Sequence, residues 1–266
     1  MRFAALLFCA IILAACENAP VRWKTANELA SAPPAGAALV IGRAGQAMFV
    51  PSPIVPITLP PQACAHSLVM TRLYGREWYA AWWQIRADSS AMLVVARSLD
   101  DGRSWGDPAV ADARDRAVVG CARPAPSIAS DSATGYVHLA YSLDPAEGAG
   151  VWFTHSMEHG DIWHAPVGIL YGGDFARTSI AASGDTVVVA YEYPLASDAR
   201  IGLAVSFTDG HIFDFNVPVS GADEATSHPR VALSGRTIAV AWQLRAPDSG
   251  DRKPAAITML RVGEIQ

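Results

Sequence analysis

The chain has 266 residues, a formal net charge of −5 and 51% hydrophobic residues. This mildly acidic balance argues against a nucleic-acid partner, because binding to a phosphate backbone is driven by a basic surface. Beyond residue 15 no apolar run reaches the roughly 18 residues that a membrane-spanning helix needs. The remaining length suits a single all-β domain with a sizeable core.

Residues 1–15 are predicted to be a secretory signal peptide. A charged start containing Arg2 is followed by a short apolar run from Ala4 to Ala15. The segment Leu13-Ala14-Ala15-Cys16 resembles the bacterial lipobox, which implies cleavage before Cys16 and lipidation of that residue. An ordinary signal with a chance cysteine is the alternative.

The lipobox resemblance predicts an anchored protein with a tether and one folded domain. Glu17 follows the lipidated cysteine, which implies sorting to the outer membrane of the cell envelope. Residues 16–37 contain Pro20, Pro33, Pro34 and several small residues, and we expect them to link the lipid to the domain at 38–266. The membrane is therefore one expected partner, reached through the lipid.

One eight-residue stretch, from Ser98 to Trp105, predicts a tight turn between two strands. Gly102 can adopt the positive φ that such a turn requires. Ser98 and Asp100 can accept hydrogen bonds from exposed backbone N–H groups, and Trp105 can cover the turn with apolar surface.

The same plan recurs twice, at starting points 58 and 50 residues further on. The second copy keeps the serine, an acid, the glycine and the tryptophan, and the third keeps the serine, the glycine and an aromatic residue. The retained positions are Ser156, Glu158, Gly160 and Trp163, and then Ser206, Gly210 and Phe213. This pattern resembles the Asp-box of the bacterial neuraminidase repeat found in sialidases. The resemblance implies a β-propeller in which the box is a structural turn on the side away from the ligand.

Four copies of a strand pattern surround these turns. In each copy a second strand, rich in Val, Ile and Ala, ends at an aromatic residue; these residues are Trp82, Tyr141, Tyr191 and Trp242. Strands that are apolar on both faces are typical of sheets packed between other sheets. We therefore predict an all-β propeller with four blades of four antiparallel strands.

The fourth copy is incomplete, because the chain ends soon after its third strand at Ala256–Leu260. We expect a strand from the N-terminal side to close this blade. Short runs at Ala38–Gly42, Ala47–Val50 and Ile54–Leu59 are the candidates, and they could instead form part of a fifth blade.

Cys64 and Cys121 lie 57 residues apart, which is one repeat period, and each is followed by Ala and a basic residue. In an oxidising compartment a disulfide between them is the favoured interpretation. Two free buried thiols, or a metal site that adds His66, are the alternatives.

The face opposite the turns is expected to carry any ligand site. Arg123, Arg177 and Arg230 stand at or just before the first strands of three successive copies, with His66 at the matching place in the first copy and His228 just before Arg230. In sialidases three arginines at comparable positions bind the carboxylate of sialic acid, so the resemblance implies part of such a ring. The alternative is that each arginine pairs with a nearby acid, such as Asp174 or Asp223.

The catalytic residues that the resemblance would require are harder to place. A sialidase needs a tyrosine nucleophile with an activating glutamate and an acid/base aspartate. Glu192 and Tyr193, at the end of a second strand, are the candidate pair. We expect a binding or scaffolding module for an anionic sugar or a protein partner, with an exo-sialidase or related glycoside hydrolase as the alternative.

Histidines also gather near the second turn, where His155, Met157 and His159 alternate and His164 follows. Such a set can bind copper or zinc. However, Met157 matches the places of Leu99 and Phe207, which favours a core role, and His159 falls on the turn itself. We therefore expect no metal site, and no motif predicts a cofactor.

Overall fold

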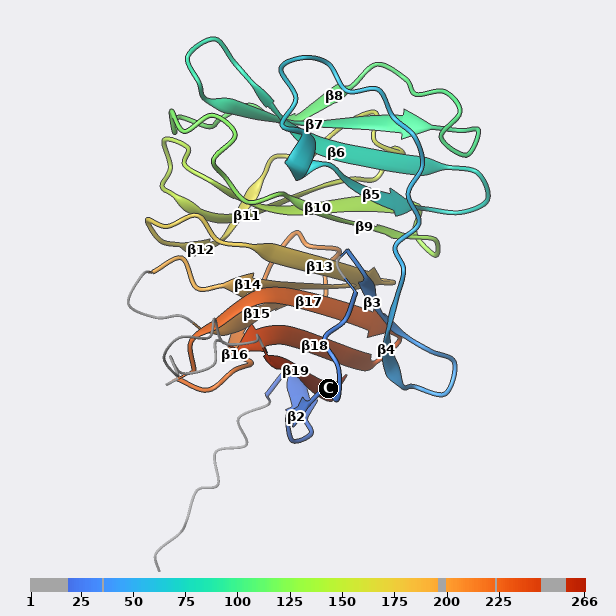
Figure 1. The fold of residues 1–266 in the computed structure, drawn as a ribbon, viewed down its shortest axis with the longest axis vertical. Coiled ribbons are helices and arrows are strands. Elements are labelled where there is room, and N and C mark those ends of the chain that lie inside the picture. The colour runs from blue at the N-terminus through green and yellow to red at the C-terminus, as the bar shows by residue number, and fades with distance from the viewer. Residues whose placement is uncertain (1–18, 35, 196–199, 223, 245–256) are drawn as a thin grey trace, which may run out of the picture.

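The computed structural model describes residues 19–34, 36–195, 200–222, 224–244 and 257–266. In these residues the chain forms four antiparallel sheets, a two-stranded hairpin and one 3₁₀ turn, η1 (Ala65–Ser67). The sheets follow one another from the top to the bottom of Figure 1, and the hairpin lies beside the last sheet. No helix in the described part is long and apolar enough to cross a membrane.

The first three sheets each contain four strands that are neighbours in sequence. The first is β5 (Val69–Arg72), β6 (Trp78–Ile85), β7 (Ala91–Ser98) and β8 (Ala109–Asp112). The second is β9 (Ser127–Asp131), β10 (Tyr136–Leu143), β11 (Gly150–Ser156) and β12 (Val167–Tyr171). The third is β13 (Thr178–Ser183), β14 (Thr186–Glu192), β15 (Ile201–Ser206) and β16 (Phe215–Pro218). These units are the predicted four-stranded repeats and are consistent with propeller blades.

The fourth sheet is completed from the N-terminal side of the chain. Its own strands are β17 (Thr226–Ser234), β18 (Thr237–Leu244) and β19 (Ile257–Ile265). The outer edge of β19 pairs with β1 (Val21–Trp23), and β2 (Asn27–Glu28) pairs with another part of the same strand. A strand from the N-terminal side therefore lies at the outer edge of this sheet.

The completing strand does not come from the predicted runs. β3 (Ala38–Ile41) and β4 (Ala47–Val50) pair with each other, and residues 54–59 form no strand. The stretch expected to be a tether contains both β1 and β2. A three-residue strand has too few positions to show an apolar alternation, which explains why the sequence pattern points elsewhere.

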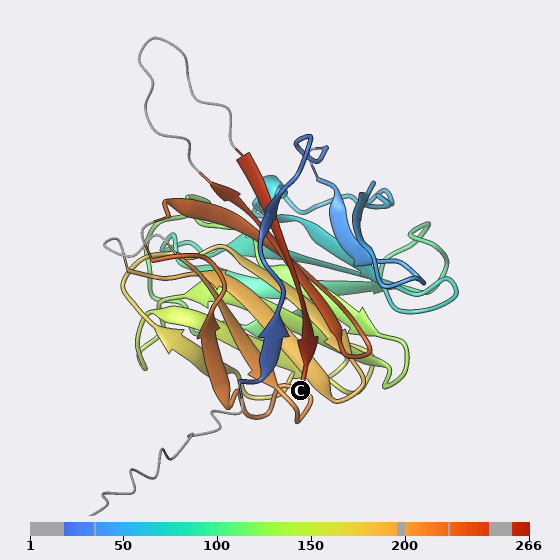
Figure 2. The same ribbon diagram turned by 90° about the horizontal axis from the view of Figure 1, so that it is seen from below.

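The core lies between neighbouring sheets, where the second and third strands of the first three sheets are largely buried on both faces; in the fourth sheet β18 is buried and β19 is mostly half-buried. In β14, Val187 to Tyr191 are fully buried, and the whole of β11 is buried. Figure 2, seen from below, shows the sheets overlapping as successive twisted layers. Small residues such as Ala190, Ala204 and Ala239 have no exposed surface, which allows the layers to approach closely.

In all three repeated turns the serine hydroxyl oxygen accepts two backbone N–H groups, one of which belongs to the residue two positions later, at 3.4, 3.3 and 3.2 Å in chain order. The other is the N–H of the glycine four residues later, at 2.9 Å in the Ser98 and Ser156 turns and 3.0 Å in the Ser206 turn. The glycines adopt the expected positive φ, and the residue before each glycine does so too. In the first turn the Asp100 carboxylate also accepts the Ser104 N–H at 2.8 Å.

The segment between the hairpin and η1 packs on the first sheet, while the hairpin packs on the fourth. Ile57 and Leu59 contact the cluster around Trp82, and Phe49 contacts the cluster around Ala239. The predicted disulfide between Cys64 and Cys121 is present and joins the start of the first sheet to the loop before β9.

Substitution of Gly102 by alanine should destabilise the protein more than the same change at Gly45. Both glycines have φ near +76°, so each alanine costs about 1–2 kcal/mol of backbone strain. A Cβ at Gly102 would also lie 2.6 Å from Val55 Cβ, whereas one at Gly45 would meet nothing within 4 Å. The overpacking adds about 1–3 kcal/mol for Gly102→Ala. The free energy of unfolding in urea measures both changes, and equal losses would contradict the packing of the first turn against Val55.

Candidate functional site

Four charged or titratable residues gather on the face opposite the repeated turns. Arg177 precedes β13, Glu192 ends β14, and His228 and Arg230 belong to β17. We call this group the Arg177–Arg230 cluster. It forms because the first strand of the fourth sheet lies against the first strand of the third, which brings equivalent ends together.

Glu192 is the centre of the cluster. Its Oε2 accepts the backbone N–H of Arg177 at 3.1 Å, and its Oε1 accepts the backbone N–H of His228 at 2.9 Å. The Arg177 Nη1 lies 3.4 Å from Oε1. The Glu192 carboxylate thus holds the backbone just before β13 and the backbone at His228, where β17 is irregular.

That irregular point is a β-bulge. The register of β17 against β18 shifts between Ser227 and Arg230, and His228 has a φ of 56°, which is rare for a residue with a side chain. Pro229 has no N–H to contribute to the ladder at this point. The bulge turns the His228 N–H toward Glu192.

Arg230 is the residue whose charge the cluster leaves uncompensated. Its guanidinium donates to the Pro229 carbonyl oxygen at 3.0 Å, and among the described residues it has no acidic partner. Burial first, and the positive charge of Arg177 second, lower the pKa of Arg230. Two guanidinium groups and one carboxylate, which pairs with Arg177 alone, therefore leave a net positive charge here.

His228 adds no charge near neutral pH. Its burial is the main reason that its pKa is lowered, and the positive charges of Arg177 and Arg230 act in the same direction against the opposing effect of Glu192. Its Nδ1 lies 3.0 Å from the Ser227 hydroxyl. The imidazole can therefore accept or donate one hydrogen bond to a ligand.

A small cavity of about 90 Å³ opens beside Arg230 and His228. It is bounded on one side by Gln243 and Thr258 of the fourth sheet and on the other by the segment at Pro33 and Pro34. A space of this size is well below the roughly 300 Å³ of an ordinary small-molecule pocket. It is large enough for a carboxylate group.

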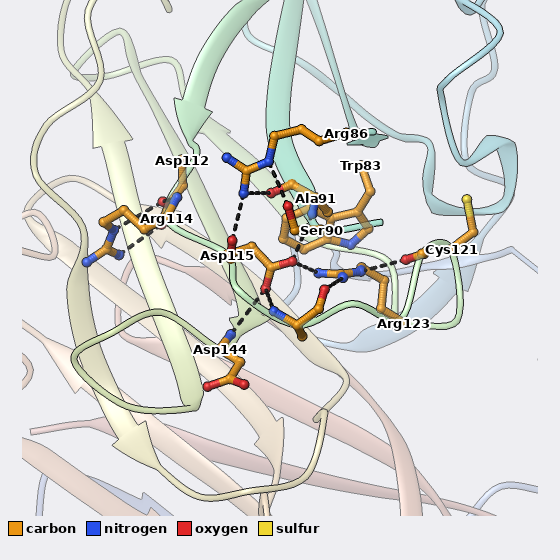
Figure 3. A network of polar contacts seen from close by, with 12 residues as sticks. Trp83, Arg86, Ser90, Ala91, Asp112, Arg114, Asp115, Cys121, Arg123 and Asp144 are labelled. Atoms are coloured by element: carbon orange, nitrogen blue, oxygen red, sulfur yellow. Dashed lines mark hydrogen bonds and ion pairs between the residues drawn. The ribbon is translucent and has the colours of Figure 1, made fainter. Parts of the chain in front are cut away.

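The structure corrects the assignment of Arg123 to the ligand site. Its side chain is fully buried and forms an ion pair of 2.9 Å with Asp115, whose side chain is buried as well (Figure 3). Its Nε donates to the Gly120 carbonyl oxygen at 2.9 Å, and the guanidinium lies over the Trp83 ring. No ligand can reach a guanidinium enclosed in this way.

Asp115 organises the loop between β8 and β9 around this ion pair. Its Oδ2 accepts the Ala91 N–H at 2.8 Å, and its backbone carbonyl oxygen accepts a hydrogen bond of 2.6 Å from Arg86 (Figure 3). The expected alternative, pairing of each arginine with a nearby acid, is thus correct for Arg123. The acid is Asp115 rather than Asp174, and Asp223 lies outside the described residues.

The remaining candidates do not join the cluster. Tyr193 packs against Tyr191 and the Arg200 guanidinium, on the other side of the strand end from Glu192. Successive side chains of a strand point to opposite faces, which separates the proposed catalytic pair. His66 is exposed in η1 on the first sheet and makes no polar contact with the cluster residues among the described contacts.

No protein-family model and no curated protein matches this sequence. Among solved structures, a protein of unknown function from Dyadobacter fermentans is similar with a TM-score of 0.51 at 13% identity, covering 71% of this chain and 50% of that one. This likeness shows a shared fold, and the chain spans about half the length of that protein.

Two weaker likenesses are to enzymes. The microbial sialidase Hz136 has a TM-score of 0.48 at 14% identity, covering 73% of this chain and 44% of the other. Xylan beta-1,4-xylosidase from Bacillus halodurans has a TM-score of 0.48 at 12% identity, covering 85% and 52%. At this similarity neither likeness carries an argument about activity.

Replacement of Asp115 by asparagine should destabilise the protein by about 3–5 kcal/mol, because it leaves the buried charge of Arg123 without its partner. Adding Arg123→Met to this variant should restore part of the loss. Asp107→Asn removes an exposed acid that precedes β8 and should change the free energy of unfolding by less than about 0.5 kcal/mol. Chemical denaturation of the four proteins measures this, and a loss under about 1 kcal/mol in Asp115→Asn would contradict the role of the ion pair.

Proposed function

We propose that this protein is a lipid-anchored binding module of the cell envelope whose Arg177–Arg230 cluster recognises a carboxylate on an anionic sugar or a protein partner. The observation that carries the proposal is the half-buried Arg230 guanidinium, which has no acidic partner among the described residues and lies beside a second arginine. A buried charge is stable only when it is paired, so an anionic ligand group would complete the site.

The chemistry of the cluster selects a carboxylate. A guanidinium presents two parallel N–H donors that match the two oxygens of a carboxylate. The small cavity beside Arg230 admits such a group, while the rest of the ligand would remain outside. Glu192 would repel the ligand if it were free, but its oxygens already accept hydrogen bonds from Arg177 and His228.

Hydrolysis of a sialoside is the weaker alternative for the same face. That reaction needs a nucleophile activated by a base within hydrogen-bond reach. Glu192 is engaged with backbone N–H groups, and Tyr193 packs on the other side of the strand end. We therefore favour binding without turnover.

Calorimetric titration of the protein from residue 19 onward, which keeps β1 and β2, with sialyllactose, glucuronate and a glutamate-rich peptide tests the proposal. At least one ligand should bind, and binding should weaken as salt is added. Arg230→Ala should lower the affinity about 10- to 150-fold, the worth of one charge-assisted hydrogen-bonded contact. Arg177→Ala should do the same, while Arg236→Ala, which removes an exposed arginine paired with Glu264, should have no effect.

Three results would contradict the proposal. The first is the absence of binding by all three carboxylated ligands, and the second is binding that is unchanged in Arg230→Ala. The third is release of the fluorophore from a fluorogenic sialoside that is lost in both Arg177→Ala and Glu192→Ala, which would establish the hydrolase instead. Comparison of the sugar and peptide titrations separates the two sources of the carboxylate.

The anchor is tested independently. Incorporation of labelled fatty acid into the protein, expressed in a bacterium that processes lipoproteins, should be abolished by Cys16→Ser. Cys9→Ser should keep the label, because Cys9 lies in the segment that is removed. Equal labelling of both variants would show that Cys16 is not the lipidated residue.

A further inference from the structure

On the face of the repeated turns, three histidines from two sheets converge. His155 belongs to β11, His164 follows the second turn, and His211 lies in the third turn. One ring nitrogen from each lies within 4.8 Å of the others. The centroid of the His155 ring is 4.5 Å from that of His164 and 4.6 Å from that of His211.

His155 is the buried member of the group and has no hydrogen-bond partner. Only 2% of its surface is exposed, and neither ring nitrogen has a partner among the described atoms. A buried polar atom without a partner costs about 1–3 kcal/mol, so such atoms point to a missing ion or ligand. Three imidazoles can lie this close only when they are uncharged or share a bound cation.

The other two histidines are already oriented. His211 Nδ1 lies 2.7 Å from the Thr208 carbonyl oxygen, which leaves Nε2 free. Metal-binding histidines commonly donate their second ring N–H to a carbonyl oxygen in this way, which fixes the ring. The backbone N–H of His164 donates to the His155 carbonyl oxygen at 2.9 Å, which holds these two residues side by side.

A carboxylate stands next to the group. Glu158 Oε2 is buried without a hydrogen-bond partner and lies 4.0 Å from His164 Nε2. Met157 and His159, which the sequence pattern had placed with the candidate metal ligands, lie outside the group. Met157 is only half-buried, so its expected core role is wrong, and His159 Nδ1 lies 3.4 Å from Glu77 instead.

We propose that His155, His164 and His211 bind one divalent transition-metal ion of the Zn²⁺ class, which connects the second and third sheets at their turns. Imidazole nitrogens favour Zn²⁺, Cu²⁺ and Ni²⁺ over Mg²⁺ and Ca²⁺, which prefer oxygen ligands. Three histidines leave a fourth position of a tetrahedral site open for Glu158 or water. This proposal departs from the expectation of no metal site.

Calorimetric titration of untagged, chelator-treated protein with Zn²⁺ tests this proposal. We expect saturation at one equivalent, a higher thermal unfolding midpoint in the presence of Zn²⁺, and visible absorption of a Co²⁺ complex. His211→Ala and His164→Ala should each weaken Zn²⁺ binding by more than the about 10- to 100-fold loss that follows removal of an outer-shell partner. Both residues are at least partly exposed, so these variants should still fold.

His66→Ala is the matched control, because His66 is an exposed histidine on the first sheet. It should bind Zn²⁺ as the unchanged protein does. Absence of saturable Zn²⁺ binding, equal affinity in His211→Ala, or tighter binding of Ca²⁺ than of Zn²⁺ would overturn the proposal. Its failure would leave the Arg177–Arg230 cluster untouched, since that site lies on the opposite face.

Discussion

The Arg177–Arg230 cluster depends on how the outer edge of β19 is paired. An unpaired strand edge exposes a row of backbone N–H and C=O groups, and here β1 and β2 cover it. The chain must then return from β2 to β3, and on the way Pro33 and Pro34 pass the cavity beside Arg230. The segment that completes the fourth sheet therefore also limits the cavity to about 90 Å³, and the size of any group bound there follows from how the sheet is closed.

The repeated core could be predicted from the sequence, whereas the closing strand could not. The second strands are long and apolar, so their existence is clear from the sequence. Their ends are not, because β6 continues three residues past Trp82 to Ile85 and β18 two residues past Trp242 to Leu244. β1 has only three residues, and one of them, Arg22, is exposed. The ion pair between Arg22 and Glu264 joins positions that are 242 residues apart in the sequence. Local periodicity contains no information about such a partner.

The sequence predicts on which face of the sheets the candidate arginines lie, but it does not predict which residues they contact. Equivalent positions in the repeats do place Arg123, Arg177 and Arg230 at the same end of their sheets. What each arginine contacts depends on the loop before it, and the loop between β8 and β9 is long enough to fold Asp115 back onto Arg123. The group of His155, His164 and His211 could not be predicted from the sequence either. His211 belongs to a different repeat from His155, and the spacing along the chain does not show that they are in contact.

The departures of the second and third turns from the first have a chemical consequence. In the first turn Asp100 accepts the Ser104 N–H, and in the third Thr208 Oγ1 accepts the equivalent Ile212 N–H at 3.0 Å. Glu158 makes no such bond, and its Oε2 is left without a partner beside His164. The serine-to-glycine hydrogen bond is kept in all three turns, so the fold is unaffected by these substitutions. Among the described residues of the three turns, only in the second is the acidic side chain left without the turn hydrogen bond, and that carboxylate is the one that lies beside the histidines of the proposed metal site.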